Sequence, residues 1–158
     1  MRWTTMLALA LAVAATARAD QEVSYPDGYR QWTHVKSMLI HDPKHPLFGA
    51  FGGIHHVYVN PAGRTAMEEG RAFPDGTVLV FDLLEAKEDG GAWIEGRRKV
   101  LAVMRKDAAR FAATGGWGFE GFKEGARAER VVTDARGQCF GCHQSAAKTD
   151  HVFTRWRP

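Results

Sequence analysis

This sequence has few cysteines, few long apolar runs and no large excess of either charge. Only two cysteines occur in 158 residues, which excludes a scaffold held together by several disulfides. Beyond one short run near the start, no apolar stretch reaches the about 20 residues that a membrane-spanning helix needs. With 21 Lys plus Arg against 18 Asp plus Glu, the chain also lacks the strongly basic character typical of nucleic-acid binding. These absences predict neither a membrane span nor a nucleic-acid partner.

The first nineteen residues have the pattern of a secretory signal peptide. They begin with the basic Arg2, continue with an apolar run over 6–15 and end in an A-x-A cleavage site at 17–19. Removal of this leader takes two of the 21 basic residues, so 19 remain against 18 acidic ones and the net charge falls to +1. We therefore expect an exported protein in which residues 20–158 form a single domain.

The rest of the chain alternates β-branched and aromatic segments with Gly-, Pro- and Asp-containing turns. This pattern predicts strands over 32–40, 54–59, 77–86, 92–104 and 116–122. Short helices are expected over 61–70 and 106–116, and a final helix over 138–148. Short connections between the strands favour antiparallel pairing, so the predicted fold class is α+β, mainly an antiparallel β-sheet with a few short helices and a C-terminal helix.

Both cysteines lie in the stretch QCFGCHQ (138–144), with His143 directly after the second. Two lone cysteines in an exported protein often form a disulfide, but a C-x-x-C pair closes a very small ring and is usually a redox catalyst. A thioredoxin-like site would need a neighbouring βαβ unit, which the pattern does not provide. A zinc site would recruit His143 and His151, although structural zinc sites space their histidines more closely. The remaining interpretation, which C-x-x-C-H favours, is covalent attachment of a c-type haem.

Haem attachment gives the spacing of this motif a geometric reason. Thioether bonds from Cys139 and Cys142 would fix the porphyrin edge against one helical turn, and His143 would then be the proximal ligand of the iron. Electron carriers close the opposite side with a strong ligand such as methionine, but no methionine follows the motif. The methionines of the mature chain lie upstream, and Met104 ends an apolar strand, as a core residue does. We expect one covalently bound haem c with a vacant or weakly occupied sixth position.

Several segments, spread over nearly the whole mature chain, resemble the cytochrome P-460 and cytochrome c′-beta family of β-sheet haem proteins. The tail is the most specific of them, because KTDHVFTR carries far more information than a bare C-x-x-C-H. The matching segments are YPDGYRQW (25–32), HHVYVNP (55–61), FPDGTVLV (73–80), KDAARFA (106–112), GWGF (116–119) and CFGCHQSAAKTDHVFTRWRP (139–158). The resemblance implies a periplasmic, usually dimeric protein with a five-coordinate haem c that binds nitric oxide.

Phe81 separates the two branches of this family. The cytochrome P-460 enzymes carry a lysine at the matching position, which cross-links to the haem and supports hydroxylamine oxidation. Phenylalanine has no nucleophilic nitrogen, so this cross-link cannot form and the chain resembles the c′-beta branch more closely. Strand parity places Phe81 on the inward face with Leu79 and Leu83. Alignment with the family makes Phe51 a second wall of the aromatic distal pocket.

His55 stands where the cytochrome P-460 enzymes carry arginine. It shares strand parity with Val57, whereas His56 shares parity with Tyr58, so periodicity alone does not decide which histidine faces inward. An inward His55 could ligate the iron, donate a hydrogen bond to a bound ligand or act as a general base. The alternative is a structural or solvent-facing histidine. The remaining histidines outside the motif are expected at the surface: His34, His41, His45 and His151.

Three functions follow from these predictions. The first is a haem protein that binds nitric oxide or a similar small gaseous or nitrogen-oxide ligand, for scavenging, storage or relay. The second is an oxidoreductase acting on hydroxylamine, nitric oxide or peroxide, with His55 as the candidate catalytic residue. The third is a six-coordinate electron-transfer cytochrome with a redox partner protein. A homodimer is expected in each case.

Overall fold

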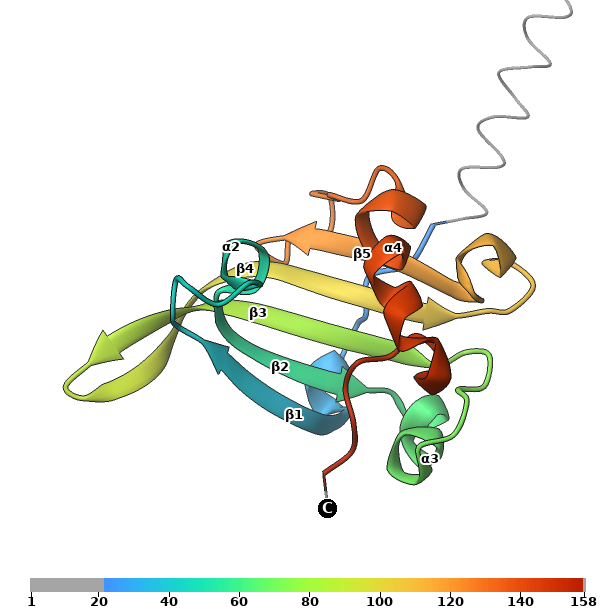
Figure 1. The fold of residues 1–158 in the computed structure, drawn as a ribbon, viewed down its shortest axis with the longest axis horizontal. Coiled ribbons are helices and arrows are strands. Elements are labelled where there is room, and N and C mark those ends of the chain that lie inside the picture. The colour runs from blue at the N-terminus through green and yellow to red at the C-terminus, as the bar shows by residue number, and fades with distance from the viewer. Residues whose placement is uncertain (1–21, 158) are drawn as a thin grey trace, which may run out of the picture.

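The computed structural model describes residues 22–157, and a five-stranded antiparallel sheet forms its centre (Figure 1). The strands pair in chain order: β1 (Thr33–Ile40), β2 (Gly53–Val59), β3 (Val78–Asp89), β4 (Ala92–Lys106) and β5 (Trp117–Lys123). The α+β prediction and all five predicted strands are confirmed. The predicted signal peptide, residues 1–19, lies outside the described residues. Over 22–157, no helix is both long and apolar enough to cross a membrane.

Short helices flank the sheet, and three of them join near the C-terminus. The separate ones are η1 (Tyr29–Gln31), α2 (Phe48–Phe51), α3 (Pro61–Glu69) and η2 (Ala112–Thr114). A π-helical turn η3 (Arg136–Phe140), the short α4 (Gly141–His143) and the 3₁₀ helix η4 (Gln144–Thr149) follow without a break and are called here the C-terminal helical segment. Figure 1 shows this segment lying across one face of the sheet. The predicted C-terminal helix is thus confirmed in a more irregular form.

The sheet is covered on both faces, and successive side chains of a strand contribute to opposite faces. On β3, Leu79 and Phe81 belong to one apolar cluster, and Val80 belongs to the cluster on the opposite face. The first cluster includes Phe119 of β5 and Phe140 of the C-terminal helical segment. The second includes residues of the N-terminal stretch, such as Val23. The predicted parity of Phe81 is therefore confirmed, and its side chain lies on the face that carries the C-x-x-C-H motif.

Helix α3 shows how closely local signals determine the structure. The side-chain Oδ1 of Asn60 accepts hydrogen bonds from the backbone amides of Gly63 at 3.2 Å and Val78 at 3.0 Å. Its Nδ2 donates to the carbonyl of Gly76 at 2.9 Å. Pro61 begins the helix, and Gly70 ends it with a left-handed φ of 65°. Asn60 thus joins α3 to the start of β3 and to the turn before it.

The helix predicted over 106–116 is wrong, because only the short turn η2 forms there. Lys106 pairs with Trp117 across β4 and β5, so the chain must reverse within the intervening residues. The amide of Gly116 donates to the carbonyl of Phe111 at 2.9 Å, which closes the loop before a second helical turn can form. Tertiary pairing of the two strands therefore overrides the local helical pattern.

Candidate functional site

The C-terminal helical segment places both cysteines on one side of a helical turn. Cys139 and Cys142 are three residues apart, which is the spacing of neighbours on a helix surface. Both are free thiols, with Cys139 half-buried and Cys142 exposed. Burial raises the pKa of Cys139 to about 11. A redox-active dithiol needs a lowered thiol pKa, so this environment disfavours the redox-catalyst interpretation.

His143 is oriented by one ring nitrogen and leaves the other available. Its Nδ1 lies 2.7 Å from the carbonyl oxygen of His151, to which it donates in the neutral tautomer. Burial lowers the pKa of His143, which favours that neutral form. Its ring packs between Phe119 and Phe153, with centroid distances of 5.1 and 5.0 Å. No described residue forms a hydrogen bond with Nε2, so this atom has the free lone pair that a metal ligand needs.

The expectation of a surface position for His151 is wrong. This residue is half-buried, and its ring packs against Phe140 with a centroid distance of 5.1 Å. Its Nδ1 lies 3.2 Å from the carbonyl oxygen of His143, so the two histidines contact each other reciprocally. An ideal Cβ on Gly115 would come within 2.6 Å of Nε2 of His151, so this close approach requires glycine.

Zinc binding is not supported by this arrangement. Among residues 22–157, no group of three or more His, Cys, Asp or Glu side chains is arranged to hold a metal ion. His151 supports His143 through its backbone rather than joining it as a second ligand. The other histidines expected at the surface, His34, His41 and His45, are indeed exposed.

His55, and not His56, faces the interior. His55 is 3% exposed, and neither of its ring nitrogens has a hydrogen-bond partner among the described residues. Burial lowers its pKa to about 4, so the ring is neutral at neutral pH. His56 points to the other face of the sheet, where its ring nitrogens lie 2.6 Å from Ser37 Oγ and 2.6 Å from Glu95 Oε1. The structure thus answers the question that strand periodicity left open.

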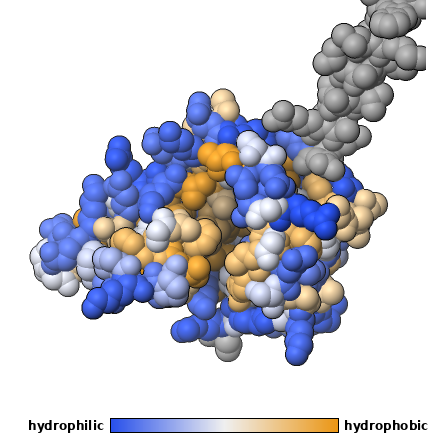
Figure 2. Space-filling model, turned by 45° about the horizontal axis from the view of Figure 1, so that its top comes forward, coloured by the Kyte–Doolittle hydropathy of each residue, from blue (hydrophilic) through white to orange (hydrophobic). Residues whose placement is uncertain are grey.

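The three predicted distal residues, His55, Phe81 and Phe51, come together on this face of the sheet. The ring of His55 lies 4.6 Å from the ring of Phe81, at an angle of 33°. Phe51 of α2 meets Phe81 edge-on at 5.6 Å, and 39% of Phe51 remains exposed. On the side where Figure 1 shows α2 and the C-terminal helical segment, Figure 2 shows hydrophobic surface gathered around a hollow. An apolar, partly exposed wall therefore surrounds one buried polar ring.

These residues fit a haem group, and His55 provides the test. A buried polar group without a hydrogen bond costs about 1–3 kcal/mol, so native proteins rarely leave one unpaired. A polar ligand or metal-bound group next to His55 would remove that cost. On the same face of the sheet, Cys139, Cys142 and Nε2 of His143 provide two free thiols and one free imidazole nitrogen. The donor set is the one that C-x-x-C-H attachment uses.

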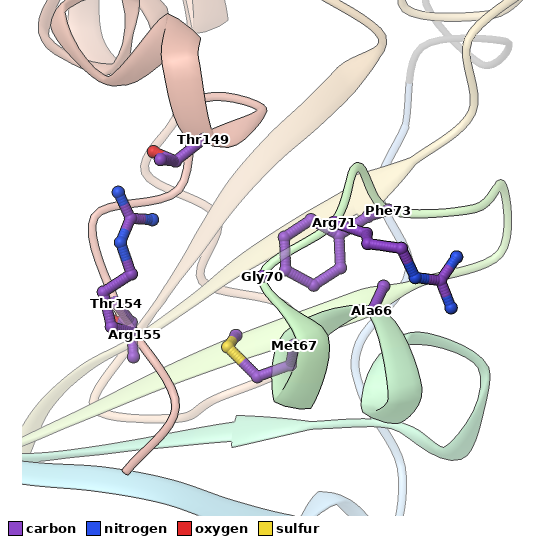
Figure 3. A pocket seen from close by; sticks show the side chains of 8 residues that line it. All are labelled: Ala66, Met67, Gly70, Arg71, Phe73, Thr149, Thr154 and Arg155. Carbon is purple, nitrogen blue, oxygen red and sulfur yellow. The ribbon is translucent and has the colours of Figure 1, made fainter.

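Two other hollows flank the C-terminal helical segment but lie away from these residues. The smaller, about 20 Å³, is shown in Figure 3 between α3 and the chain end, and has room for little more than a water molecule. The larger, about 480 Å³, is open and borders η4 and the tail from Val152 to Arg155. It touches Phe153, which packs on His143, but neither hollow is lined by a cysteine, by His55 or by Phe81.

Comparison with known proteins agrees with this arrangement. No curated protein matches the chain. The family model for cytochrome P-460 matches residues 26–154, a span that contains all six predicted site residues: Phe51, His55, Phe81, Cys139, Cys142 and His143. The chain therefore belongs to the cytochrome P-460 family of haem-binding cytochromes.

Proposed function

We propose that this chain is an exported, periplasmic c-type cytochrome with one haem, whose iron would bind nitric oxide or a similar small ligand. The observation that carries the proposal is that one face of the sheet holds both the oriented imidazole of His143 and an aromatic wall. That imidazole is oriented for ligation, whereas the pocket residues of α2 and β3, Phe51 and Phe81, are aromatic and offer no strong ligand. Residues 20–158 form the haem domain in this proposal.

Each residue of the site has a defined task. Cys139 and Cys142 would hold the haem through thioether bonds, and His143 would supply the nitrogen that ligates its iron. When bound, haem supplies the iron that takes up the small ligand. Phe81 and Phe51 restrict the space available and keep water out of it. Because Phe81 replaces the cross-linking lysine of the cytochrome P-460 enzymes, the site resembles the c′-beta type.

His55 adds a buried polar group beside the ring of Phe81. As a neutral imidazole it carries one N–H donor and one lone pair, and both lack a partner among the described residues. It is therefore able to donate a hydrogen bond to a ligand that has an acceptor atom. Nitric oxide needs no such bond, whereas bound dioxygen is stabilised by one. A donor at this position consequently widens the range of ligands beyond nitric oxide.

The first test is spectroscopic. A pyridine haemochrome assay on the purified exported protein should report two thioether links, and these should disappear in a Cys139→Ala/Cys142→Ala variant but persist in Ser145→Ala. The ferrous protein should show a high-spin, five-coordinate spectrum that changes at once when nitric oxide is added. A low-spin spectrum without rapid ligand binding would instead identify a six-coordinate electron carrier, with His55 or Met38, its partner across β1 and β2, as the candidate sixth ligand.

Phe81 is the residue to vary for ligand access. We expect Phe81→Ala to accelerate nitric oxide binding in stopped-flow measurements, because the ring lies half-buried in the apolar wall. Phe51→Ala, which removes a more exposed ring, should accelerate it less. Equal rates in the wild-type protein and Phe81→Ala would remove Phe81 from the pocket.

A second candidate function is an oxidoreductase that acts on hydroxylamine, nitric oxide or peroxide. The unpartnered imidazole of His55 favours it, because a buried neutral histidine can accept a proton from a substrate as a general base. Steady turnover of one of these substrates, lost in His55→Leu and retained in His56→Leu, would support it. Absence of turnover in the wild-type protein leaves ligand binding as the function.

The proposal also includes a homodimer, as the family resemblance implies, and a redox partner protein. Light scattering coupled to gel filtration measures the first directly: a monomer at micromolar concentration would contradict it. Fractionation of the producing cells tests the periplasmic location, with cleavage after Ala19 expected from mass spectrometry of the mature chain.

A further inference from the structure

The backbone that holds His143 in place has an unusual conformation. The carbonyl that accepts from Nδ1 of His143 belongs to His151, and both His151 and the preceding Asp150 have left-handed φ angles, 63° and 52°. Non-glycine residues seldom adopt this conformation, and two in succession require support from their surroundings. The position of this carbonyl therefore depends on whatever holds residues 150–151.

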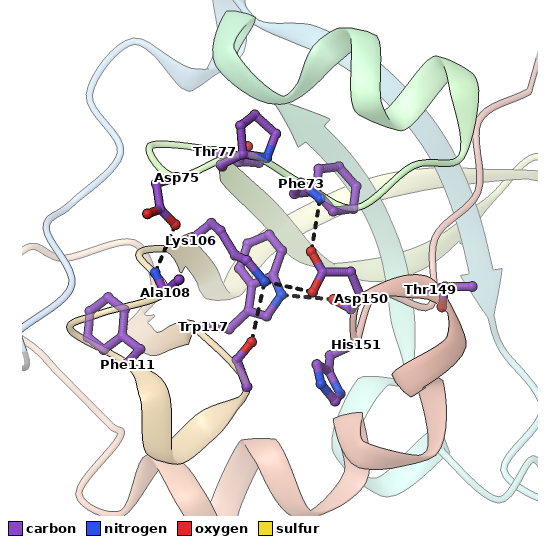
Figure 4. A network of polar contacts seen from close by, with 12 residues as sticks. Phe73, Asp75, Thr77, Lys106, Ala108, Phe111, Trp117, Thr149, Asp150 and His151 are labelled. Atoms are coloured by element: carbon purple, nitrogen blue, oxygen red, sulfur yellow. Dashed lines mark hydrogen bonds and ion pairs between the residues drawn. The ribbon is translucent and has the colours of Figure 1, made fainter.

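The support comes from the side chain and backbone of Asp150, as Figure 4 shows. Its Oδ1 lies 2.6 Å from Nζ of Lys106, and its Oδ2 accepts from the backbone amide of Phe73 at 2.9 Å. Its carbonyl accepts from Nε1 of Trp117 at 2.8 Å. Three contacts from three different parts of the chain thus fix one residue.

Lys106 is itself restrained, so the ion pair is not a loose surface contact. Its side chain is 11% exposed and that of Asp150 is 14% exposed. The ammonium group also donates to the carbonyl of Gly115 at 3.3 Å and lies 5.0 Å from the centre of the Trp117 ring. Lys106 and Trp117 are cross-strand partners at the end of β4 and β5. The pair therefore connects the backbone behind His143 to the rigid sheet.

We propose that Lys106 and Asp150 are positioning residues for His143. By locking residues 150–151 in the left-handed conformation, their ion pair sets the distance and direction of the carbonyl that accepts the Nδ1 proton. This hydrogen bond fixes the tautomer of the ring, aims Nε2 and increases its electron donation. The proposal rests on the proposed function, because it assigns these two residues to the proximal ligand of a haem.

The strength of the Nδ1 hydrogen bond should shift the reduction potential of a bound haem in a predictable direction. A stronger hydrogen bond from Nδ1 gives the imidazole more anionic character, which stabilises ferric over ferrous iron. Loss of the Lys106–Asp150 ion pair should weaken the hydrogen bond from Nδ1 of His143. It should therefore raise the reduction potential and weaken the iron–histidine bond. Neither effect is expected from a pair that contributes to stability alone.

Asp150→Asn is the most informative variant. Asparagine keeps the shape of the side chain and tolerates a left-handed φ, but loses the charge that holds Lys106. Resonance Raman spectra of the ferrous protein should show the iron–histidine stretch at lower frequency than in the wild-type protein, and redox titration should give a higher potential. Lys106→Met should shift both in the same direction. Because Lys106→Met leaves a half-buried carboxylate without its partner, the double variant Lys106→Met/Asp150→Asn provides the comparison should that protein fail to fold.

Arg98→Met is the matched control. Arg98 forms a comparable ion pair with Asp82 at 2.6 Å, with side chains 21% and 2% exposed, on the opposite face of the sheet. Loss of this pair should lower stability without moving the iron–histidine band or the potential. The proposal is overturned when Asp150→Asn leaves both quantities at their wild-type values, or when Arg98→Met shifts them equally.

The result is separable from the proposed function. When the purified protein carries no thioether-linked haem, the proposed function fails, whereas the Lys106–Asp150 pair is still tested by ¹⁵N NMR of the His143 ring. The wild-type protein should then show the tautomer protonated at Nδ1 with a proton protected from solvent. Asp150→Asn should lose that protection, and retained protection would overturn the proposal.

Discussion

On one side of the site, His143 is held by a hydrogen bond, and the backbone behind it is held by an ion pair and an indole N–H. On the other side, His55 is buried without a hydrogen bond to any described residue and contacts the ring of Phe81. Both histidines have lowered pKa values, and burial is the main cause in each case. The contrast shows that polar contacts orient the ring of His143, whereas both ring nitrogens of His55 lack a hydrogen-bond partner among the described residues.

We expect the largest difference in stability between variants of the two sides when an aromatic residue of each side is replaced by alanine. Phe140, 7% exposed, packs in the cluster beneath the C-terminal helical segment, and Phe140→Ala should lower the free energy of unfolding by about 3–5 kcal/mol. Phe51 is 39% exposed, so Phe51→Ala should lower it by about 1 kcal/mol or less. Urea denaturation of proteins with equal cofactor content measures both. Equal losses would contradict the contrast between the two sides.

Substitution of His55 should produce an intermediate effect that depends on pH. The folded-state pKa of about 4 lies below the ordinary value of 6.5, so the unfolded chain binds the extra proton first as the pH falls. The wild-type protein therefore loses stability between about pH 6.5 and 4, by at most about 3 kcal/mol from this group. His55→Leu removes this loss, so it should be more stable than the wild-type protein at pH 4.5 by a larger margin than at pH 7.

His56→Leu serves as the control for this measurement. His56 has partners in Ser37 and Glu95, so its replacement removes hydrogen bonds and should bring no gain at either pH. A loss of stability in His55→Leu at pH 7 would show instead that a bound group already satisfies the His55 ring.

The smallest effect concerns the entry to the C-terminal helical segment. The side-chain Oε1 of Gln138 accepts from the backbone amides of Thr133 and Asp134 at 2.8 and 2.7 Å. Gln138→Ala should lower the free energy of unfolding by about 1 kcal/mol. The loss is small because two exposed backbone amides would then donate to water instead of to the side chain of Gln138. The exposed Gln144, in the same segment, is the matched position, and Gln144→Ala should have no measurable effect. Thermal denaturation compares the two variants, and equal shifts would contradict a specific role for Gln138.

Local signals predicted the parts of the fold that depend on neighbours in sequence. The helix after β2 follows from Pro61 and Gly70, and the inward position of Phe81 follows from the two-residue period of a strand. The helix over 106–116 was wrong because pairing of Lys106 with Trp117 decides the path of the chain there. Strand pairing is a long-range interaction that a local pattern does not contain.

The site was predictable to a similar extent. The C-x-x-C-H spacing points to Cys139, Cys142 and His143, but nothing in the local pattern distinguishes His55 from His56, since both stand in an alternating strand. The role of His151 was missed because it acts through its backbone carbonyl and because left-handed residues are usually glycine. The one available signal was the specificity of the KTDHVFTR tail, which contains both Asp150 and His151.

The residues of the candidate site come from distant parts of the chain. The distal residues lie on α2, β2 and β3, and Asn60 ties β2 to α3 and to the start of β3. A domain of this size generally folds as one unit. The distal residues and the C-x-x-C-H motif are therefore brought together only when the whole five-stranded sheet has formed.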